Sequence, residues 1–83
     1  MKVEIKNENH EPKNIKPLIE YFQSLTHLPV FEYKGLEVEV DPTIDFKAND
    51  ALIRWTDINE GFNDKLIVNS LAEFKSYFKL VNA

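Results

Sequence analysis

The chain has 83 residues, of which 43% are hydrophobic and 29% are charged, a balance typical of one globular domain and not of a disordered segment. It contains no cysteine, which excludes disulfides and thiolate metal sites, and residues 1–10 lack the continuous apolar run of a secretory signal. We therefore expect residues 1–83 to form a single cytoplasmic domain without a membrane-spanning segment.

The net charge of −4 is concentrated in the middle of the chain. Residues 32–64 hold nine acidic residues against two lysines and one arginine, whereas residues 1–31 are neutral overall and residues 65–83 are weakly basic. Proteins that bind nucleic acid contact its phosphates through clustered lysine and arginine. The acidic middle and the single arginine therefore argue against nucleic acid as a direct ligand.

The first third of the chain predicts a strand and then a helix. Val3 and Ile5 alternate with charged residues, which indicates a short, half-buried strand at a sheet edge. Apolar residues with helical spacing then predict a helix that begins near Asn14 and stops before Pro29. Its apolar face is formed by Ile15, Leu18, Ile19, Phe22 and Leu25.

A hairpin is predicted around Lys34 and Gly35, with strands 30–33 and 36–41. A two-residue turn pairs Tyr33 with Leu36 and places every apolar side chain of the hairpin on one face. A three-residue loop would pair Glu32 with Leu36 and mix the two faces. We therefore predict the two-residue turn.

The second half of the chain predicts a loop, another strand pair and a final helix. Asp41-Pro42 is expected to end the hairpin, and the loop that follows carries Ile44 and Phe46 under the core. Residues 51–56 and 65–69 have the composition of strands and flank a loop of turn-forming residues, 57–64.

The final helix has a recognisable start. Ser70 and Glu73 match the capping box, in which two side chains satisfy backbone N–H groups of the first turn. The apolar stripe of this helix is expected to consist of Leu71, Phe74, Phe78 and Val81.

These elements predict an α+β fold in the order β-α-β-β-β-β-α. Each amphipathic helix needs a surface on which to bury its apolar stripe. We therefore expect a small antiparallel sheet of four or five strands with both helices packed on one face, and the other face open to water.

The open face of the hairpin provides the candidate site, with four acidic residues on one side: Glu32, Glu37, Glu39 and Asp41. Glu32 is expected directly opposite Glu37, and like charges facing each other across two strands destabilise the pair. Carboxylates two residues apart form a row with a spacing of about 7 Å. Such a row could imitate the phosphates of a nucleic acid, or it could simply keep the sheet face solvated and discourage edge pairing.

Aromatic residues add one further candidate. Phe62 lies in the polar loop between two predicted strands, where an exposed aromatic side chain could anchor a protein partner. Trp55 alternates with Ala51 and Ile53 and is expected in the core. Arg54 points the opposite way and is expected to pair with a carboxylate of the open face.

No pattern in the sequence predicts an enzyme, a cofactor or a metal site. His10 and His27 have no second ligand at metal spacing, and two glycines cannot build a phosphate-binding loop. Residues 57–64 carry oxygen ligands at alternate positions, as in the start of a calcium loop. The glycine nevertheless falls at the fifth position instead of the sixth, and the twelfth position lacks glutamate, so calcium binding is the weaker alternative.

The sequence thus favours a non-enzymatic module that binds another protein with a basic surface. The suggested role is an inhibitor, of the phage anti-defence or antitoxin type, whose acidic face mimics nucleic acid and blocks a basic nucleic-acid-handling protein. The alternative from another class is a structural or accessory subunit that binds through hydrophobic patches or the N-terminal edge strand. The oligomeric state is left open.

Overall fold

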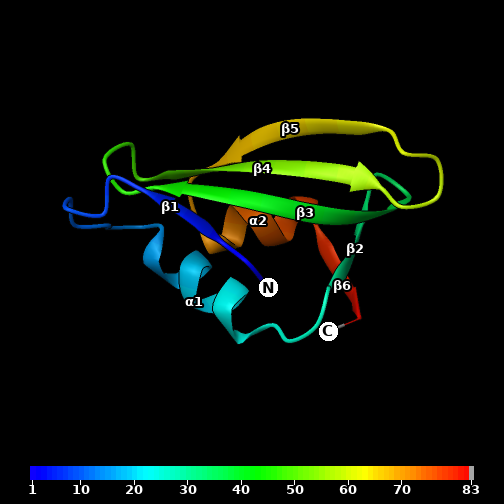
Figure 1. Ribbon diagram of the computed structural model, residues 1–83, viewed down its shortest axis with the longest axis horizontal. Coiled ribbons are helices and arrows are strands. Elements are labelled where there is room, and N and C mark those ends of the chain that lie inside the picture. The colour runs from blue at the N-terminus through cyan, green and yellow to red at the C-terminus, as the bar shows by residue number, and fades with distance from the viewer. Residues whose placement is uncertain (83) are drawn as a thin grey trace.

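The computed structural model describes residues 1–82, and its elements follow the order β-α-β-β-β-β-α-β (Figure 1). Both helices cover one face of a six-stranded sheet, while the opposite face is bare (Figure 1). The predicted α+β class with both helices on one face is confirmed. The elements are β1 (Glu4–Lys6), α1 (Lys16–Ser24), β2 (Val30–Tyr33), β3 (Leu36–Asp45), β4 (Asp50–Asp57), β5 (Asn63–Val68), α2 (Leu71–Tyr77) and β6 (Lys79–Asn82).

The sheet is organised around the long strand β3. The strand order is β5-β4-β3-β2-β6, and β1 pairs with β3 alone. All pairs are antiparallel except β1 with β3, which is parallel. One edge of β3 is shared, because β2 pairs with its first residues and β1 with its last. The expected antiparallel sheet is confirmed, but it has six strands instead of four or five, because β6 adds beside β2 and β1 adds in parallel to β3.

The hairpin register is the one that binary patterning predicts. Tyr33 lies opposite Leu36, and Phe31 lies opposite Val38. The two turn residues, Lys34 and Gly35, have φ angles of 50° and 80°, and positive φ at both central positions is the requirement of a type I′ turn. The two-residue turn is confirmed.

The hairpin does not end at Asp41-Pro42 as expected, because β3 continues to Asp45. The N–H of Phe46 donates to the carbonyl of Lys6 at 3.0 Å, which shows that even-numbered residues of β3 direct their backbone groups toward β1 and β2. Pro42 follows the same alternation. Its missing N–H therefore faces away from β4 and removes no bond of the β3–β4 ladder.

The C-terminal region also differs from the prediction. Helix α2 ends at Tyr77, and the chain then turns back as β6 to pair with β2, which would otherwise be a sheet edge. Val81, expected in the helical stripe, lies on β6 with 53% of its surface exposed. Phe78 and Leu80 point inward as alternate residues of an extended chain, a pattern that fits a strand as well as the end of a helix.

Aromatic rings connect the helices to the sheet. The Phe74 ring of α2 contacts Phe22 of α1 edge-on at 4.9 Å and stacks on Phe78 at 4.8 Å between centroids. Phe78 stacks in turn on Tyr33 at 4.7 Å, and Tyr33 contacts Trp55 of β4 at 5.1 Å. The expected helical face of α1 is buried, whereas Trp55 is half-buried at the margin of the core. This continuous packing fixes both helices against one face of the sheet.

The predicted capping box starts α2, with one shift. The N–H of Glu73 donates to Ser70 Oγ at 3.1 Å, as expected. The Glu73 carboxylate accepts the N–H of Asn69 at 2.6 Å, one residue before Ser70. Ser70 has the extended backbone typical of an N-cap residue, and the two bonds together satisfy one N–H before the helix and one in its first turn.

A second polar cluster secures β1 at the other end of the sheet. Asp45 Oδ1 accepts hydrogen bonds from the side-chain amide of Asn7 at 2.8 Å and from the N–H groups of Lys47 and Ala48 at 3.0 and 3.2 Å. These bonds, that of Asn7 foremost, hold the pKa of the Asp45 carboxyl below its usual range. The ionised carboxylate thus joins the end of β1 to the β3–β4 turn.

Substitutions at the two positions of the tight turn should affect the stability of the protein differently. A methyl group added at Gly35 meets no atom within 4 Å, so Gly35→Ala should destabilise the protein through backbone conformation alone, by about 1 kcal/mol. Lys34→Asn should leave stability unchanged or raise it by a few tenths of a kcal/mol, because asparagine tolerates positive φ. Urea unfolding of the two variants measures both effects. Equal stability of Gly35→Ala and wild type would contradict the turn type.

The contribution of Asp45 to stability should depend on pH with a definite sign. A carboxyl whose pKa is lower in the folded state contributes stability above its unfolded pKa of about 3.9, and this is lost as pH falls through the folded pKa. The stability difference between wild type and Asp45→Asn should therefore be constant above about pH 5 and shrink as the pH falls from there through the folded pKa. NMR titration should also show that Asn7→Ala raises the pKa of Asp45. An unchanged pKa in Asn7→Ala would exclude the hydrogen-bond explanation.

Candidate functional site

The acidic residues of the hairpin lie on the bare face of the sheet. Glu37, Glu39 and Asp41 alternate with the buried Val38 and Val40, so their side chains leave β3 on the side away from the helices. The segregation of apolar and acidic side chains that the sequence predicts is therefore present in the structure.

Glu32 lies between an acidic neighbour on one adjacent strand and a basic neighbour on the other. It lies directly opposite Glu37 on β3 and opposite Lys79 on β6. Glu32 and Lys79 form no ion pair, since the one ion pair within 4 Å among residues 1–82 joins two other side chains. The like-charge pair across β2 and β3 is unfavourable for the hairpin and is compensated only partly by Lys79.

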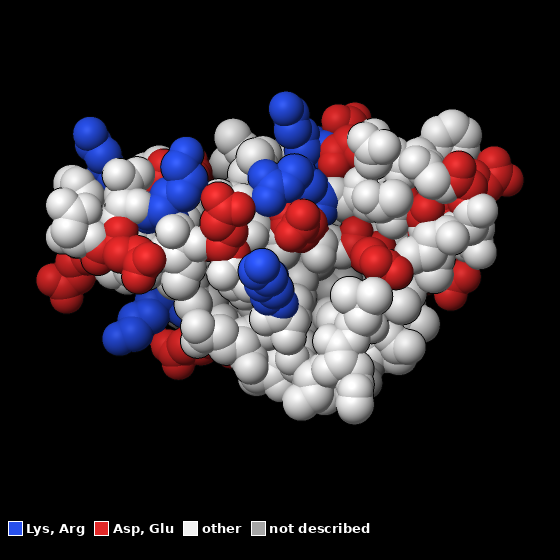
Figure 2. All heavy atoms as spheres, viewed as in Figure 1, with Lys and Arg blue, Asp and Glu red and all other residues white. Residues whose placement is uncertain are grey.

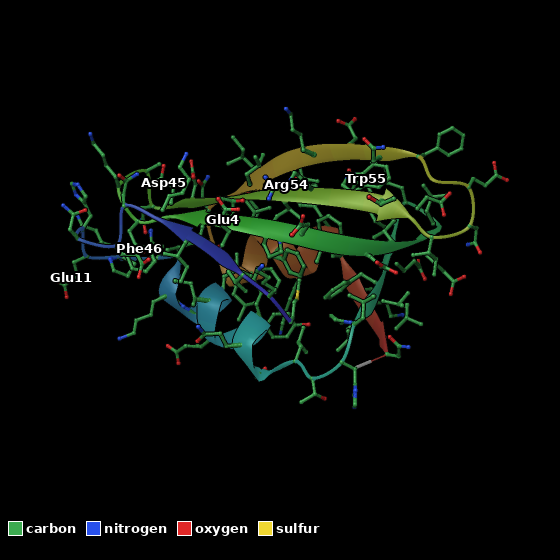
Figure 3. All side chains as sticks on the ribbon, in the orientation of Figure 1. Glu4, Glu11, Asp45, Phe46, Arg54 and Trp55 are labelled. Atoms are coloured by element: carbon green, nitrogen blue, oxygen red, sulfur yellow. The ribbon has the colours of Figure 1, made fainter. Side chains whose placement is uncertain are left out.

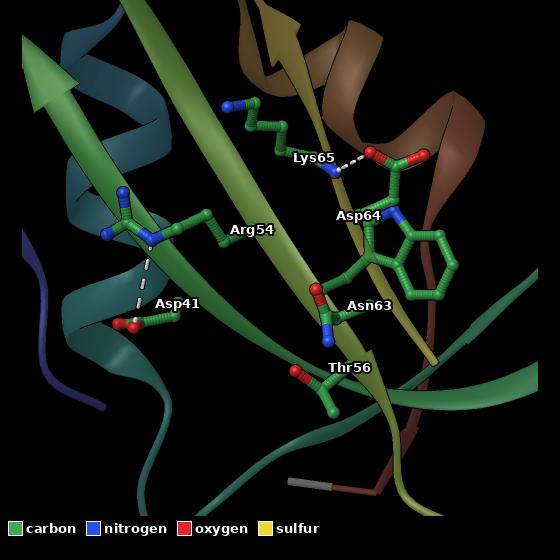
Figure 4. A pocket seen from close by; sticks show the side chains of 7 residues that line it. Asp41, Arg54, Thr56, Asn63, Asp64 and Lys65 are labelled. Carbon is green, nitrogen blue, oxygen red and sulfur yellow. Dashed lines mark hydrogen bonds and ion pairs between the residues drawn. The ribbon is translucent and has the colours of Figure 1, made fainter. Parts of the chain in front are cut away.

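Asp41 differs from the other three acids because it is engaged within the molecule (Figure 4). Its carboxylate lies 3.9 Å from Arg54 Nε, and Arg54 donates through Nη2 to Thr43 Oγ1 at 2.7 Å. Lys65 of β5 lies opposite Arg54 on its other side, so this row across the sheet consists of one acid followed by two bases. The pairing expected for Arg54 is confirmed, and Asp41 belongs to the charge-compensated centre of the face.

The acidic end of the molecule, defined here by Glu32, Glu37, Glu39 and Glu60, lies beyond that centre. Figure 2 shows carboxylates without lysine or arginine at the end that carries the β4–β5 loop, whereas the basic side chains on this view lie over the centre and toward the other end. Glu37 is exposed and its sole side-chain bond within residues 1–82 is a 3.4 Å contact from the Asn59 amide. Within residues 1–82 no ion pair joins the carboxylates of this end to a base, so it presents negative charge that Lys79 offsets only in part.

The β4–β5 loop brings Phe62 to the acidic end. The N–H of Ile58 donates to the carbonyl of Glu37 at 3.0 Å, which fastens the loop beside the β2–β3 turn. Phe62 is 62% exposed, and Ile58 also faces water. The Asp57 carboxylate accepts the N–H of Asn59 at 3.0 Å, so it caps the turn through its own backbone.

The remaining predicted residues lie apart from this site. His10 and His27 are both exposed. Within residues 1–82, no three His, Asp or Glu side chains are close enough to share a metal ion. None of the helices in this part of the chain has the length and apolar character needed to cross a bilayer. Glu11 and Phe46 lie at the end of the molecule opposite the β4–β5 loop (Figure 3).

Sequence reasoning missed Glu60 and Ile58 as neighbours of the hairpin. The register of β3 against β4 places Asp57 opposite Val38, so the loop after Asp57 necessarily lies beside Glu37. This contact could have been found by extending β3 past Pro42 to Asp45. The short turn to β4 then fixes which residues of the two strands lie opposite each other.

Comparison of the chain with protein-family models, with curated proteins and with solved structures found no match. Its function is therefore argued from its own residues.

Proposed function

We propose that this protein is a non-enzymatic protein-binding module whose acidic end docks onto a basic surface of a nucleic-acid-handling protein. The observation that carries the proposal is the array of the exposed Glu32 and Glu37 and the half-buried Glu39 on one face, with a repulsive pair built into the hairpin. Folding gains nothing from that pair, whereas a basic partner would be attracted to it.

The proposed mechanism is occlusion. Glu37 and Glu39 are two residues apart on one strand, so their carboxylates lie about 7 Å apart and can occupy positions where a partner would otherwise bind phosphates. Long-range attraction between such surfaces speeds association and weakens as salt screens the charges. The proposed role is that of an inhibitor of the phage anti-defence or antitoxin type, acting in the cytoplasm where such partners work.

A second candidate is an accessory subunit that binds through an edge strand. The edge strands β5 and β6 carry exposed apolar side chains, Ile67 and Val81, with 58% and 53% of their surfaces exposed. Apolar side chains on unpaired edges favour docking of another strand. Binding of this kind would be insensitive to salt, which separates it from the first candidate.

The main proposal predicts selective loss of partners when the acidic end is neutralised. Three immobilised baits should be compared on nuclease-treated lysate: wild type, Glu32→Gln/Glu37→Gln/Glu39→Gln, and the matched control Glu8→Gln/Glu11→Gln/Glu20→Gln, which changes net charge equally at exposed sites elsewhere. Wild type and control should retain the same basic proteins, and the first variant should lose them.

Two further readouts make the comparison decisive. Excess double-stranded DNA or RNA should displace the retained proteins, and so should salt raised from about 0.05 M to about 0.5 M. Retention of the same proteins by all three baits, or resistance to both competitors, would rule out the acidic end as the docking surface and favour edge-strand binding.

A further inference from the structure

A surface hollow of about 440 Å³ separates the β2–β3 turn from the β4–β5 loop at the acidic end. Leu36 and Glu37 form one wall, and Asn59, Glu60 and Phe62 form the other. Gly35 and Asp57 complete the lining, and the Asp57 carboxylate already accepts the N–H of Asn59. The hollow thus combines an apolar side chain and an aromatic ring with the carboxylates of Glu37 and Glu60. These are the groups that bind a side chain with an apolar stem and a cationic head.

Backbone bonds hold the two walls in place. The N–H of Asp57 donates to the carbonyl of Phe62 at 2.7 Å, and the N–H of Gly61 donates to the carbonyl of Asp57 at 2.9 Å. The bond from Ile58 to Glu37 fastens the loop to β3. A ligand would therefore find the hollow already formed, which lowers the entropy lost on binding.

The exposed ring of Phe62 is the feature that folding does not explain. It contributes nothing to the core at 62% exposure, and its faces are attractive to a cation. The nearest lysine in sequence to the hollow, Lys34, directs its Nζ over the Tyr33 ring at 5.4 Å instead. Glu37 and Glu60 form no ion pair within residues 1–82.

We propose that this hollow receives an arginine side chain of the basic partner. A planar guanidinium can stack on Phe62 while its N–H groups reach the carboxylates of Glu37 or Glu60, and its methylene stem can lie against Leu36. Lysine offers a point charge without the planar stacking surface, so it should bind less well. This inference rests on the proposed function, since it assigns one anchoring contact within the acidic end.

The test is an NMR titration with three short peptides that are identical except for one central residue: arginine, lysine or the neutral isostere citrulline. At constant ionic strength the arginine peptide should shift the backbone amides of residues 35–37 and 59–62 saturably, in the millimolar range. The lysine peptide should bind about threefold less tightly, and citrulline should give no saturable shift.

Variants identify the contacts. Phe62→Leu keeps an apolar side chain and should weaken arginine binding by about two- to fivefold, the size of an exposed cation–π contact. Glu60→Gln should weaken it similarly, whereas Glu11→Gln, at the opposite end of the molecule, should leave it unchanged. Equal shifts with arginine and citrulline, or wild-type binding by Phe62→Leu, would overturn the proposal.

The arginine titration and the neutralised bait together separate this inference from the proposed function. If the hollow binds no arginine but the neutralised bait still loses its partners, the arginine contact is wrong and the acidic docking surface remains. If arginine binds in the hollow but the neutralised bait retains every partner, the hollow is real and the proposed function is wrong.

Discussion

The register of β2 against β3 is the constraint on which the rest of the structure depends. Side chains alternate between the two faces of a strand, so a slip of one residue would turn Glu37 and Glu39 into the core and expose Val38 and Val40. The positive φ angles of Lys34 and Gly35 close the hairpin in two residues and exclude that slip. The aromatic packing of both helices and the acidic surface therefore have a common origin in one turn.

The same register divides the bare face into regions of different character. At the centre, Asp41 forms an ion pair with Arg54, and Lys65 lies on the far side of Arg54. The carboxylate of Asp41 alone is therefore a poor guide to the charge of this region. Toward the β4–β5 loop the carboxylates form no ion pair within residues 1–82. Opposite charges in the middle limit repulsion across the strands, and the proposed basic partner would be attracted to the acidic end.

Local patterns predicted the fold where a single interpretation satisfied them. The register of the hairpin could be predicted from its sequence, because only the two-residue turn kept all carboxylates out of the core. Phe78 and Val81 could not be assigned to a helix or a strand, because alternation and helical spacing both fit so short a segment. In the structure the chain after Phe78 is a strand that pairs with the edge of β2.

The candidate site was predictable to the same extent. Glu32, Glu37 and Glu39 follow from the hairpin alone. The position of Phe62 and Glu60 beside Glu37 depends on the β3–β4 register. That register could not be predicted while Pro42 was assumed to end the strand.

The central claim is that repulsion between the carboxylates of the acidic end lowers the stability of the folded protein. A double-mutant cycle of Glu32→Gln and Glu37→Gln tests it directly, because the cycle isolates the pair from the influence of Lys79 on Glu32. The account predicts an unfavourable coupling free energy of a few tenths of a kcal/mol or more, which diminishes as salt is raised. A coupling of zero, or a favourable one, would mean that the hairpin accommodates the two acids without conflict and would contradict the account.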